Sequence, residues 1–257
     1  MAMPQYIKGK IFMKQYFNAF IMCQSMFCAI PCPMKIWDEN ARDKQLLFFP
    51  FIGAEIGIIW FLLAKLCLFL NLPLFLTSFI LAVYPFVISG YIHLDGFMDV
   101  IDAVKSYRSL EKRREILKDS RVGAFAVIGC IILFIGQFAV FASMKLTNAS
   151  ALIFIPIVSR CCSSLVLNTF KKISESQYVG VAKNKGQIVV LTAQLLLILV
   201  LSFIVCGKKA IAVLSVIAGY ALALSKAYKS LEGVNGDVAG YALTISEFCG
   251  VLVLALL

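Results

Sequence analysis

The chain alternates between long apolar runs and short segments that hold most of its charged residues. A helix needs about 20 mostly apolar residues to cross the hydrocarbon core of a bilayer, and several runs approach that length. The pattern predicts an all-α fold, a polytopic membrane helix bundle that forms a single domain over residues 1–257. About seven transmembrane helices are expected, at Leu46–Leu70, Leu72–Ile92, Val122–Met144, Ala151–Phe170, Gln187–Cys206, Ala210–Leu224 and Val238–Leu257.

An eighth apolar stretch, Ile11–Ile30, is interrupted by polar residues and ends at a Pro-Cys-Pro break. The polar residues are Lys14, Gln15, Asn18 and Gln24. Proline stops a helix because it lacks the N–H group and clashes with the preceding turn. We expect this stretch to be an interfacial or re-entrant helix rather than a span.

The composition supports an integral membrane protein. Of the residues, 61% are hydrophobic and only 15% are charged, whereas soluble domains have about 45–50% apolar and about 25% charged residues. The net charge of +10 would suit nucleic acid, but no basic stripe interleaved with aromatic residues is present, so we expect no nucleic-acid partner. The nine cysteines lie mostly within apolar runs, where cysteine acts as a small hydrophobe.

Basic residues gather in segments that alternate along the chain, at residues 8–14, 35–44, 93–121, 171–185 and 226–229. The loops between the other span ends carry almost no charge, with Lys208-Lys209 as the exception. Cytoplasmic loops carry an excess of lysine and arginine. The pattern therefore predicts a cytoplasmic N-terminus and a cytoplasmic catalytic segment at residues 93–121.

Three carboxylates follow the second predicted span. Asp95, Asp99 and Asp102 lie at i, i+4 and i+7, on one face of a helix. Such a stripe is self-repelling unless a cation lies within it, and Mg²⁺ is usually held by carboxylates together with substrate phosphates. We favour metal binding over a solvated acidic face, because unpaired carboxylates beside an apolar span are costly. Gly96 in the same turn suggests a close backbone approach to a ligand or a helix start.

A short basic helix is predicted downstream, because charges of opposite sign alternate at helical spacing over residues 111–118. Asp119-Ser120-Arg121-x-Gly123 then opens the next span. Asp119 or Ser120 could cap the helix of that span, and the remaining backbone N–H groups could bind an anion. Arg121 could bind a phosphate through two parallel hydrogen bonds. Capping alone would also explain the first two residues.

The segments His93-Leu94-Asp95-Gly96-x-x-Asp99-x-x-Asp102-Ala103 and Ile116-Leu117-Lys118-Asp119-Ser120-Arg121-x-Gly123 together resemble the signature of the cobalamin synthase family, the adenosylcobinamide-GDP ribazoletransferases. The resemblance runs the length of the chain. It includes Phe49-Pro50-Phe51-Ile52-Gly53, Ser159-Arg160, Gly233-Val234-Asn235-Gly236-Asp237-Val238-x-Gly240 and Glu247. Glu55 in the first span is a departure from the family pattern.

The resemblance implies an Mg²⁺-dependent enzyme of the last assembly step of adenosylcobalamin, in the cytoplasmic (inner) membrane of a bacterium or archaeon. The phosphorus that bears cobinamide in adenosylcobinamide-GDP would be attacked by a hydroxyl of α-ribazole or its 5′-phosphate, and GMP would leave. The implied metal ligands are Asp95, Asp99, Asp102 and Asp119, and the implied catalytic residues are Asp95, Asp99, Asp102 and His93. The implied substrate-binding residues are Arg121, Lys118, Asn235, Asp237 and Arg160.

Several of these assignments have simpler alternatives. His93, the only histidine, could be structural, and Asn235 with Asp237 could form a turn and a helix cap. Arg160 within a span needs a partner, for which Glu55 or an aspartate of the cluster is a candidate.

Two other functions share some of these features. A CDP-alcohol phosphotransferase of lipid synthesis also uses an aspartate cluster, but the Ala-Arg that follows its Asp-Gly is absent here. A cation transporter would place its carboxylates at mid-span. Membrane lipid is an expected partner in any case, and the broad apolar faces make a homo-oligomer plausible.

Overall fold

The computed structural model describes residues 5–173 and 184–257, and the described chain is helical with no β-strand. Part of the fourth basic segment, residues 174–183, lies outside the described residues. The helices are α1 (Gln5–Phe27), α2 (Phe49–Phe69), α3 (Leu74–Ile88), α4 (Ile92–Lys105), α5 (Leu110–Ile116), α6 (Ala124–Ser143), α7 (Ile155–Thr169), α8 (Lys185–Cys206), α9 (Ala210–Leu231) and α10 (Gly236–Leu256). Three 3₁₀ segments join them, η1 (Glu39–Leu47), η2 (Leu146–Ile153) and η3 (Gly207–Lys209).

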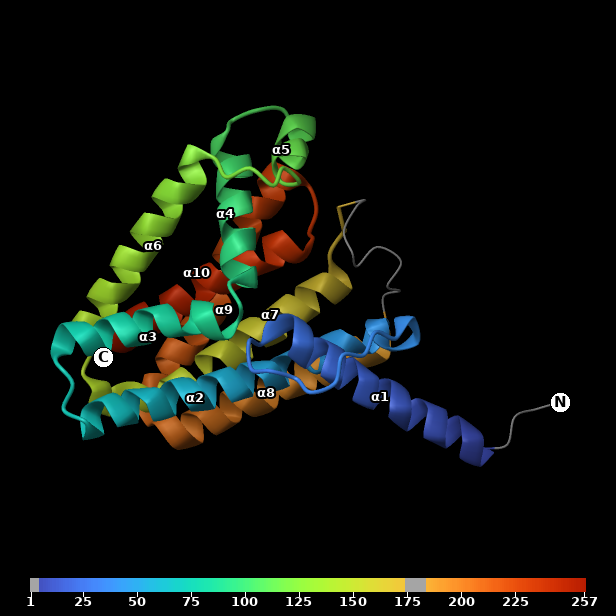
Figure 1. The fold of residues 1–257 in the computed structure, drawn as a ribbon, viewed down its shortest axis with the longest axis horizontal. Coiled ribbons are helices and arrows are strands. Elements are labelled where there is room, and N and C mark those ends of the chain that lie inside the picture. The colour runs from blue at the N-terminus through green and yellow to red at the C-terminus, as the bar shows by residue number, and fades with distance from the viewer. Residues whose placement is uncertain (1–4, 174–183) are drawn as a thin grey trace.

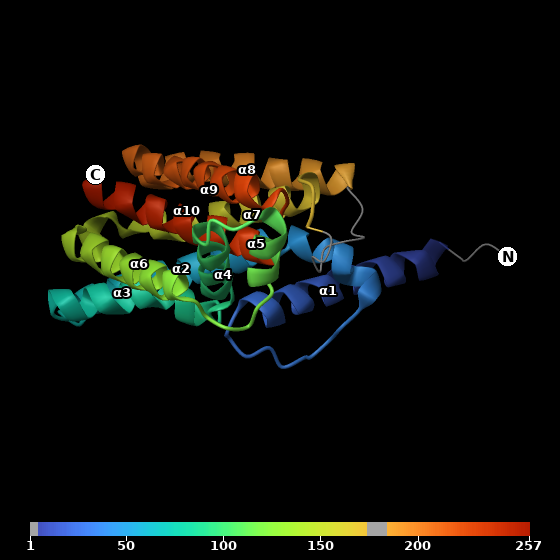
Figure 2. The same cartoon turned by 90° about the horizontal axis from the view of Figure 1, so that it is seen from above.

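The bundle is built around α7 and α10, which are the most buried of its long helices. Helix α10 packs against α9, α4 and α7, while α2 packs against α7, and α3 against α6. Figures 1 and 2 show α4 crossing the bundle and α5 standing at its edge, with α6 running from α5 toward the far end of α3. The C-terminus lies at that far end, away from the N-terminus.

The polytopic helical bundle is confirmed. Among the described residues, five stretches are long and apolar enough to cross a membrane. The longest, Lys185–Leu231, contains both α8 and α9, which are separated by a turn at Gly207 with φ of +56°. The others are Phe49–Phe69, Ala124–Ser143, Ala149–Thr169 and Gly236–Leu256, and a sixth arises if α3 and α4 are counted as one broken span.

The expected span Leu72–Ile92 is broken in the structure. Helix α3 ends at Ile88 after 15 residues, about 22 Å of helix against a hydrocarbon core of about 30 Å. The chain then bends by 89° into α4. Gly90 and Tyr91 both have φ of +62°, a left-handed conformation that glycine adopts freely and tyrosine rarely does. Because α4 turns across the bundle and carries three aspartates and a lysine, we treat it as lying outside the membrane-spanning segments.

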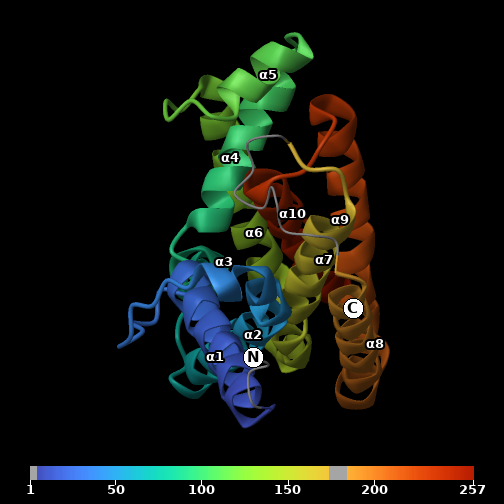
Figure 3. The same cartoon turned by 90° about the vertical axis from the view of Figure 1, so that its right-hand side faces the viewer.

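The apolar stretch Ile11–Ile30 forms one unbroken helix up to Phe27. It is not among the candidate spans, and it packs on η1 and α2. Figure 3 shows α1 beside the bundle on the face where the N-terminus lies. Its helical nature is confirmed, while its interfacial position stays a prediction.

Candidate active site

Helix α4 is amphipathic, with its apolar residues packed into the bundle and Asp95 and Asp99 on another face. A Cβ atom at Gly96 would lie 2.8 Å from the Cα atom of Asp237 at the start of α10. Only glycine therefore allows these two helices to approach so closely. The close approach expected at Gly96 is real, but its partner is the backbone of α10 rather than a ligand. It brings Asp237 to the acidic face of α4.

The carboxylates around this crossing repel one another. Burial, followed by the charges of Asp95, Asp237 and Asp102 in that order of effect, raises the pKa of Asp99 to about 7. A neighbouring cation would relieve this repulsion and favour the ionised form. The donor chemistry thus suits a hard divalent ion, although no three metal-binding side chains of the described residues converge on one point.

The loop before α10 positions Asp237. Asn235 caps this helix, because its Oδ1 accepts a hydrogen bond from the backbone N–H of Val238 at 2.9 Å. Its Nδ2 donates to Oδ2 of Asp237 at 2.6 Å. The turn-and-cap interpretation of Asn235 is therefore confirmed, and the same residue also orients an acid of the cluster.

Asp102 caps a different helix. Its Oδ2 accepts from the backbone N–H of Gly123 at 2.6 Å, and its Oδ1 from that of Ala126 at 2.9 Å. The expectation that Asp119 or Ser120 would cap this span is wrong, because the cap comes from α4. A Cβ atom on Gly123 would lie 2.6 Å from Oδ2 of Asp102, so glycine makes room for the carboxylate. The anion bound at the N-terminus of α6 is thus the carboxylate of Asp102 and not a ligand.

Asp119 and Arg121 pair with each other on the surface. The Nε and Nη2 atoms of Arg121 donate to the two carboxylate oxygens of Asp119 at 3.0 and 2.7 Å. These bonds lower the pKa of Asp119 to about 2. The Arg121 side chain is 88% exposed, and Lys118 is exposed as well. Arg121 and Lys118 are therefore exposed to solvent, and Asp119 is engaged by Arg121.

The predicted basic helix is present as α5. One local pair forms, between Lys112 and Glu115. The two arginines instead reach the end of α9: Arg113 donates to the carbonyl of Ser230 at 3.2 Å, and Arg114 donates to that of Leu231 at 2.9 and 3.1 Å. Positive charge is favourable at a helix C-terminus. The helix is thus docked on α9 and is not only a solvated surface element.

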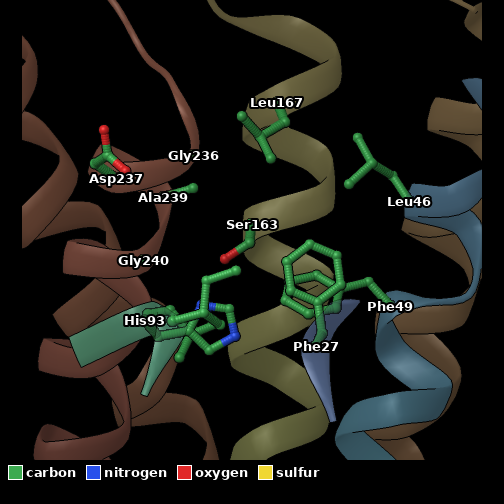
Figure 4. Close-up of a pocket in the computed structure, with 12 residues that line it drawn as sticks. Phe27, Leu46, Phe49, His93, Ser163, Leu167, Gly236, Asp237, Ala239 and Gly240 are labelled. Carbon is green, nitrogen blue, oxygen red and sulfur yellow. The ribbon is translucent and has the colours of Figure 1, made fainter. Parts of the chain in front are cut away.

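A cavity of about 70 Å³ lies next to Asp237, between α4, α7, α10 and the ends of α1 and α2. Figure 4 shows Asp237 at one end and His93 at the other, with the rings of Phe27 and Phe49 between α7 and α2 and the Ser163 hydroxyl directed toward His93. The His93 ring stacks on Phe27, with centroids 5.8 Å apart and an interplanar angle of 14°.

His93 is held neutral in this cavity. Its side chain is 8% exposed, and its Nε2 atom has no hydrogen-bond partner among the described residues. Burial and the nearby Arg160 guanidinium hold the pKa of the imidazole well below its usual range. A buried polar atom without a partner is uncommon in a folded protein. Nε2 is therefore an unsatisfied polar atom at the wall of the cavity.

Arg160 lies behind this cavity rather than in its lining. Its Nη1 donates to Oε1 of Glu247 at 2.7 Å, and Ser159 Oγ donates to the same oxygen at 2.7 Å. The guanidinium also lies over the Phe49 ring, 5.5 Å from its centroid. The candidate partners Glu55 and the aspartates of the cluster are wrong, since the partner is Glu247.

Among the lining residues, Phe27 and Ser163 were not identified from the sequence, and Phe49 appeared only within a motif of the family resemblance. A signal for Ser163 was present, because it follows Ser159 by four residues in an apolar run and so shares its helix face. Phe27 and Phe49 carried no such signal, since aromatic residues are common in spans.

The fold and the site together define a polytopic membrane enzyme whose acids and polar pocket meet where one helix crosses the others. A family model for cobalamin-5-phosphate synthase matches residues 19–255. The chain belongs to this family, and it is a transferase of cobalamin biosynthesis.

Its relatives are matched over nearly their full length. An adenosylcobinamide-GDP ribazoletransferase of Clostridium botulinum (strain Alaska E43 / Type E3) is 39% identical, covering 93% of this chain and 97% of the relative. One of Clostridium perfringens (strain SM101 / Type A) is 37% identical, covering 95% and 100%, and one of Clostridioides difficile (strain 630) is 28% identical, covering 93% and 97%. No solved structure matches the chain.

Proposed function

We propose that this enzyme transfers a cobinamide-phosphoryl group from adenosylcobinamide-GDP to α-ribazole or α-ribazole 5′-phosphate, with Mg²⁺ bound, and releases GMP. The observation that carries the proposal is the set of mutually repelling carboxylates at the crossing of α4 and α10, next to a pocket that contains an unpartnered imidazole nitrogen. Such a set would favour a bound cation, and the cation would offset the charge of a diphosphate.

The residues that would hold Mg²⁺ are Asp95, Asp99 and Asp237, whose side chains would have to turn toward one ion because they do not converge on one point in the described structure. Asp95 and Asp237 are the two largest charge contributions to the raised pKa of Asp99. Asp102 is less suited, because both of its oxygens already accept backbone N–H groups. When bound, the ion would neutralise the diphosphate and bring it to the carboxylates.

The remaining steps fall to the side chains. The attacking ribose hydroxyl forms a new bond to the phosphorus that bears cobinamide, while the bond from that phosphorus to the bridging oxygen breaks and its electron pair leaves with GMP. The hydroxyl proton would pass to a carboxylate of this cluster, for which Asp99 is the candidate because it lies among the other acids at the crossing. His93 Nε2 would accept or share a hydrogen bond with the acceptor. Arg121 and Lys118, both exposed, would meet the phosphates from the solvent side.

The charge distribution supports a site on the cytoplasmic face of the inner membrane of a bacterium or archaeon. The basic segments at residues 35–44, 93–121 and 226–229 lie at the end of the bundle that holds the site, as the positions of η1, α5 and the end of α9 show in Figures 1 and 3. The turn with Lys208 and Lys209 lies at the other end. The excess of lysine and arginine on one side is what a cytoplasmic face carries.

The test is GMP release by purified protein in detergent, with adenosylcobinamide-GDP, Mg²⁺ and each acceptor in separate reactions. We expect GMP with at least one acceptor, and none with EDTA or without acceptor. Asp99→Asn should lower release by about 10²–10⁴-fold, whereas Asp43→Asn, which removes a carboxylate paired with Lys44, should retain it. No GMP with either acceptor from folded wild-type protein would refute the proposal.

A further inference from the structure

A second cavity lies on the opposite side of α4, between α4, α6, α9 and α10. Its volume is about 610 Å³, and its walls are mostly aliphatic and aromatic. They include Phe97, Ile101, Ile132, Leu133, Tyr241 and Phe248. The helices that carry these residues, α4, α6 and α10, are labelled in Figure 1. The proposed chemistry does not use this groove.

The groove and the carboxylates of Asp95 and Asp99 lie on opposite sides of α4. Phe97, Ile101 and Lys105 are spaced four residues apart, so they form one stripe of α4. Each of the first two lies two residues, and so about 200° of rotation, from Asp95 and Asp99 respectively. Phe97 stacks on Tyr241 of α10, with centroids 5.8 Å apart. An occupant of the groove therefore packs against the back of the helix that carries the carboxylates.

One end of this groove is positively charged. Lys105 of α4 and Lys226 of α9 both line it, together with Tyr107. Neither lysine forms an ion pair with another described residue. Tyr107, whose side chain is 78% exposed, adds the amphipathic ring that is typical of the membrane–water boundary.

The other wall belongs to a membrane span. Helix α6 is a candidate span with a mean hydropathy of 2.5. Ile128 and Ile132 on its groove side are 53% and 66% exposed in the chain alone. Since these side chains lie on a candidate span and are largely uncovered by the described protein, the hydrocarbon of a bilayer would reach them. The groove thus runs from the acyl region of the membrane to a pair of lysines.

We propose that this groove binds an anionic phospholipid, with an acyl chain along the apolar wall and the phosphate at Lys105 and Lys226. The two lysines give the charge complementarity, because basic residues near the membrane surface attract anionic headgroups. A nucleotide or sugar does not fit these walls, which offer it few polar partners. The proposal is independent of the substrates proposed above.

The test measures lipid retention by native mass spectrometry of the full chain in detergent, titrated with phosphatidylglycerol or phosphatidylcholine of the same acyl chains. We expect one phosphatidylglycerol retained tightly, and phosphatidylcholine at least tenfold more weakly. The variant Lys105→Gln/Lys226→Gln should weaken phosphatidylglycerol binding about 25-fold, from about fivefold for each lysine. The control variant Lys208→Gln/Lys209→Gln removes the same charge about 25 Å away along α9 and should bind as the wild type.

A second variant tests the apolar wall with the lysines intact. Ile132→Trp fills the groove from an exposed position and should reduce phosphatidylglycerol retention at least tenfold in monodisperse protein. Equal retention of both lipids, or unchanged binding in both groove variants, overturns the proposal. A dimer that Ile132→Trp dissociates also overturns it, because the occupant would then be a second copy of the chain.

Discussion

The buried pair of Arg160 and Glu247 gives a prediction whose size follows from the structure. The side chains are 1% and 9% exposed, so the pair is not screened by water. Glu247→Leu removes the acceptor of two hydrogen bonds, those from Arg160 Nη1 and Ser159 Oγ, both 2.7 Å long. Arg160 then keeps the carbonyl of Pro156 at 3.2 Å as its only acceptor among the described residues, and its charge stays buried.

The cost should be large. Removing one partner of a buried ion pair destabilises proteins by about 3–5 kcal/mol. For a chain of this size, about 1 kcal/mol corresponds to about 2–4 °C in melting temperature, so Glu247→Leu should lower the Tm by about 6–20 °C. The double variant Arg160→Met/Glu247→Leu removes both charges at similar volume and should recover most of this loss, since such replacements are often neutral.

Thermal unfolding in detergent can be followed by the fluorescence of Trp60. This side chain is fully buried and donates to the carbonyl of Leu81 at 3.0 Å. Trp37 is 59% exposed, so a Trp37→Phe background leaves one informative probe. Ser202→Ala, a buried serine outside the pair, serves as the matched control.

Two results would refute the reasoning. A Glu247→Leu protein that melts within about 2 °C of the parent would show that the pair contributes little. A double variant no more stable than the single one would show that the loss came from packing around α10 rather than from an uncompensated charge.

Three further outcomes are expected. Asp99→Asn should lower turnover by about 10²–10⁴-fold. In the wild type, the Mg²⁺ concentration that gives half-maximal activity should rise by up to about tenfold for each pH unit below 7, because protons compete with the ion for Asp99. A Mg²⁺ requirement that stays constant from pH 6 to 8 would contradict this. Gly123→Ala places a methyl group against the Asp102 carboxylate and should cost about 1–2 kcal/mol in thermal unfolding through loss of the α6 cap; an unchanged Tm would show that the cap is dispensable. Arg114→Gln loses both bonds to the Leu231 carbonyl and should raise hydrogen exchange in residues 106–121 without changing the Tm by more than a few degrees; unaltered exchange would mean that α5 is held elsewhere.

Much of the fold could be predicted from apolar run length alone, because a bilayer imposes a fixed span on each helix. The limits of α6 and α10 lie within about two residues of the expected spans. The break in Leu72–Ile92 was not predicted, because it lies at the left-handed Gly90 and Tyr91 and is followed by a helix that packs on the distant α10. The helix propensity of residues in an apolar run does not depend on contacts with distant segments, so it does not predict such a break.

The candidate site could likewise be predicted only in part. The spacing of Asp95 and Asp99 identifies an acidic face without any tertiary information. The partners of other polar residues depend on contacts between distant segments: Asp102 reaches a cap 21 residues away, and Arg160 finds its acid 87 residues away. Charge pattern indicates that such groups need partners, but only the packing selects which ones.

The bend at residues 89–91 has a consequence for how this chain tolerates insertions. Each residue added to or removed from a helix rotates the rest of that helix by about 100°. One extra residue in the first turn of α4 would rotate the helix so that Asp95 and Asp99 leave the crossing with α10 and the apolar stripe of Phe97 moves toward it. The number of residues between the bend and Asp95 therefore sets which face of α4 meets α10. We expect this number to be constant among relatives, whereas the loop between α4 and α5 has no such constraint.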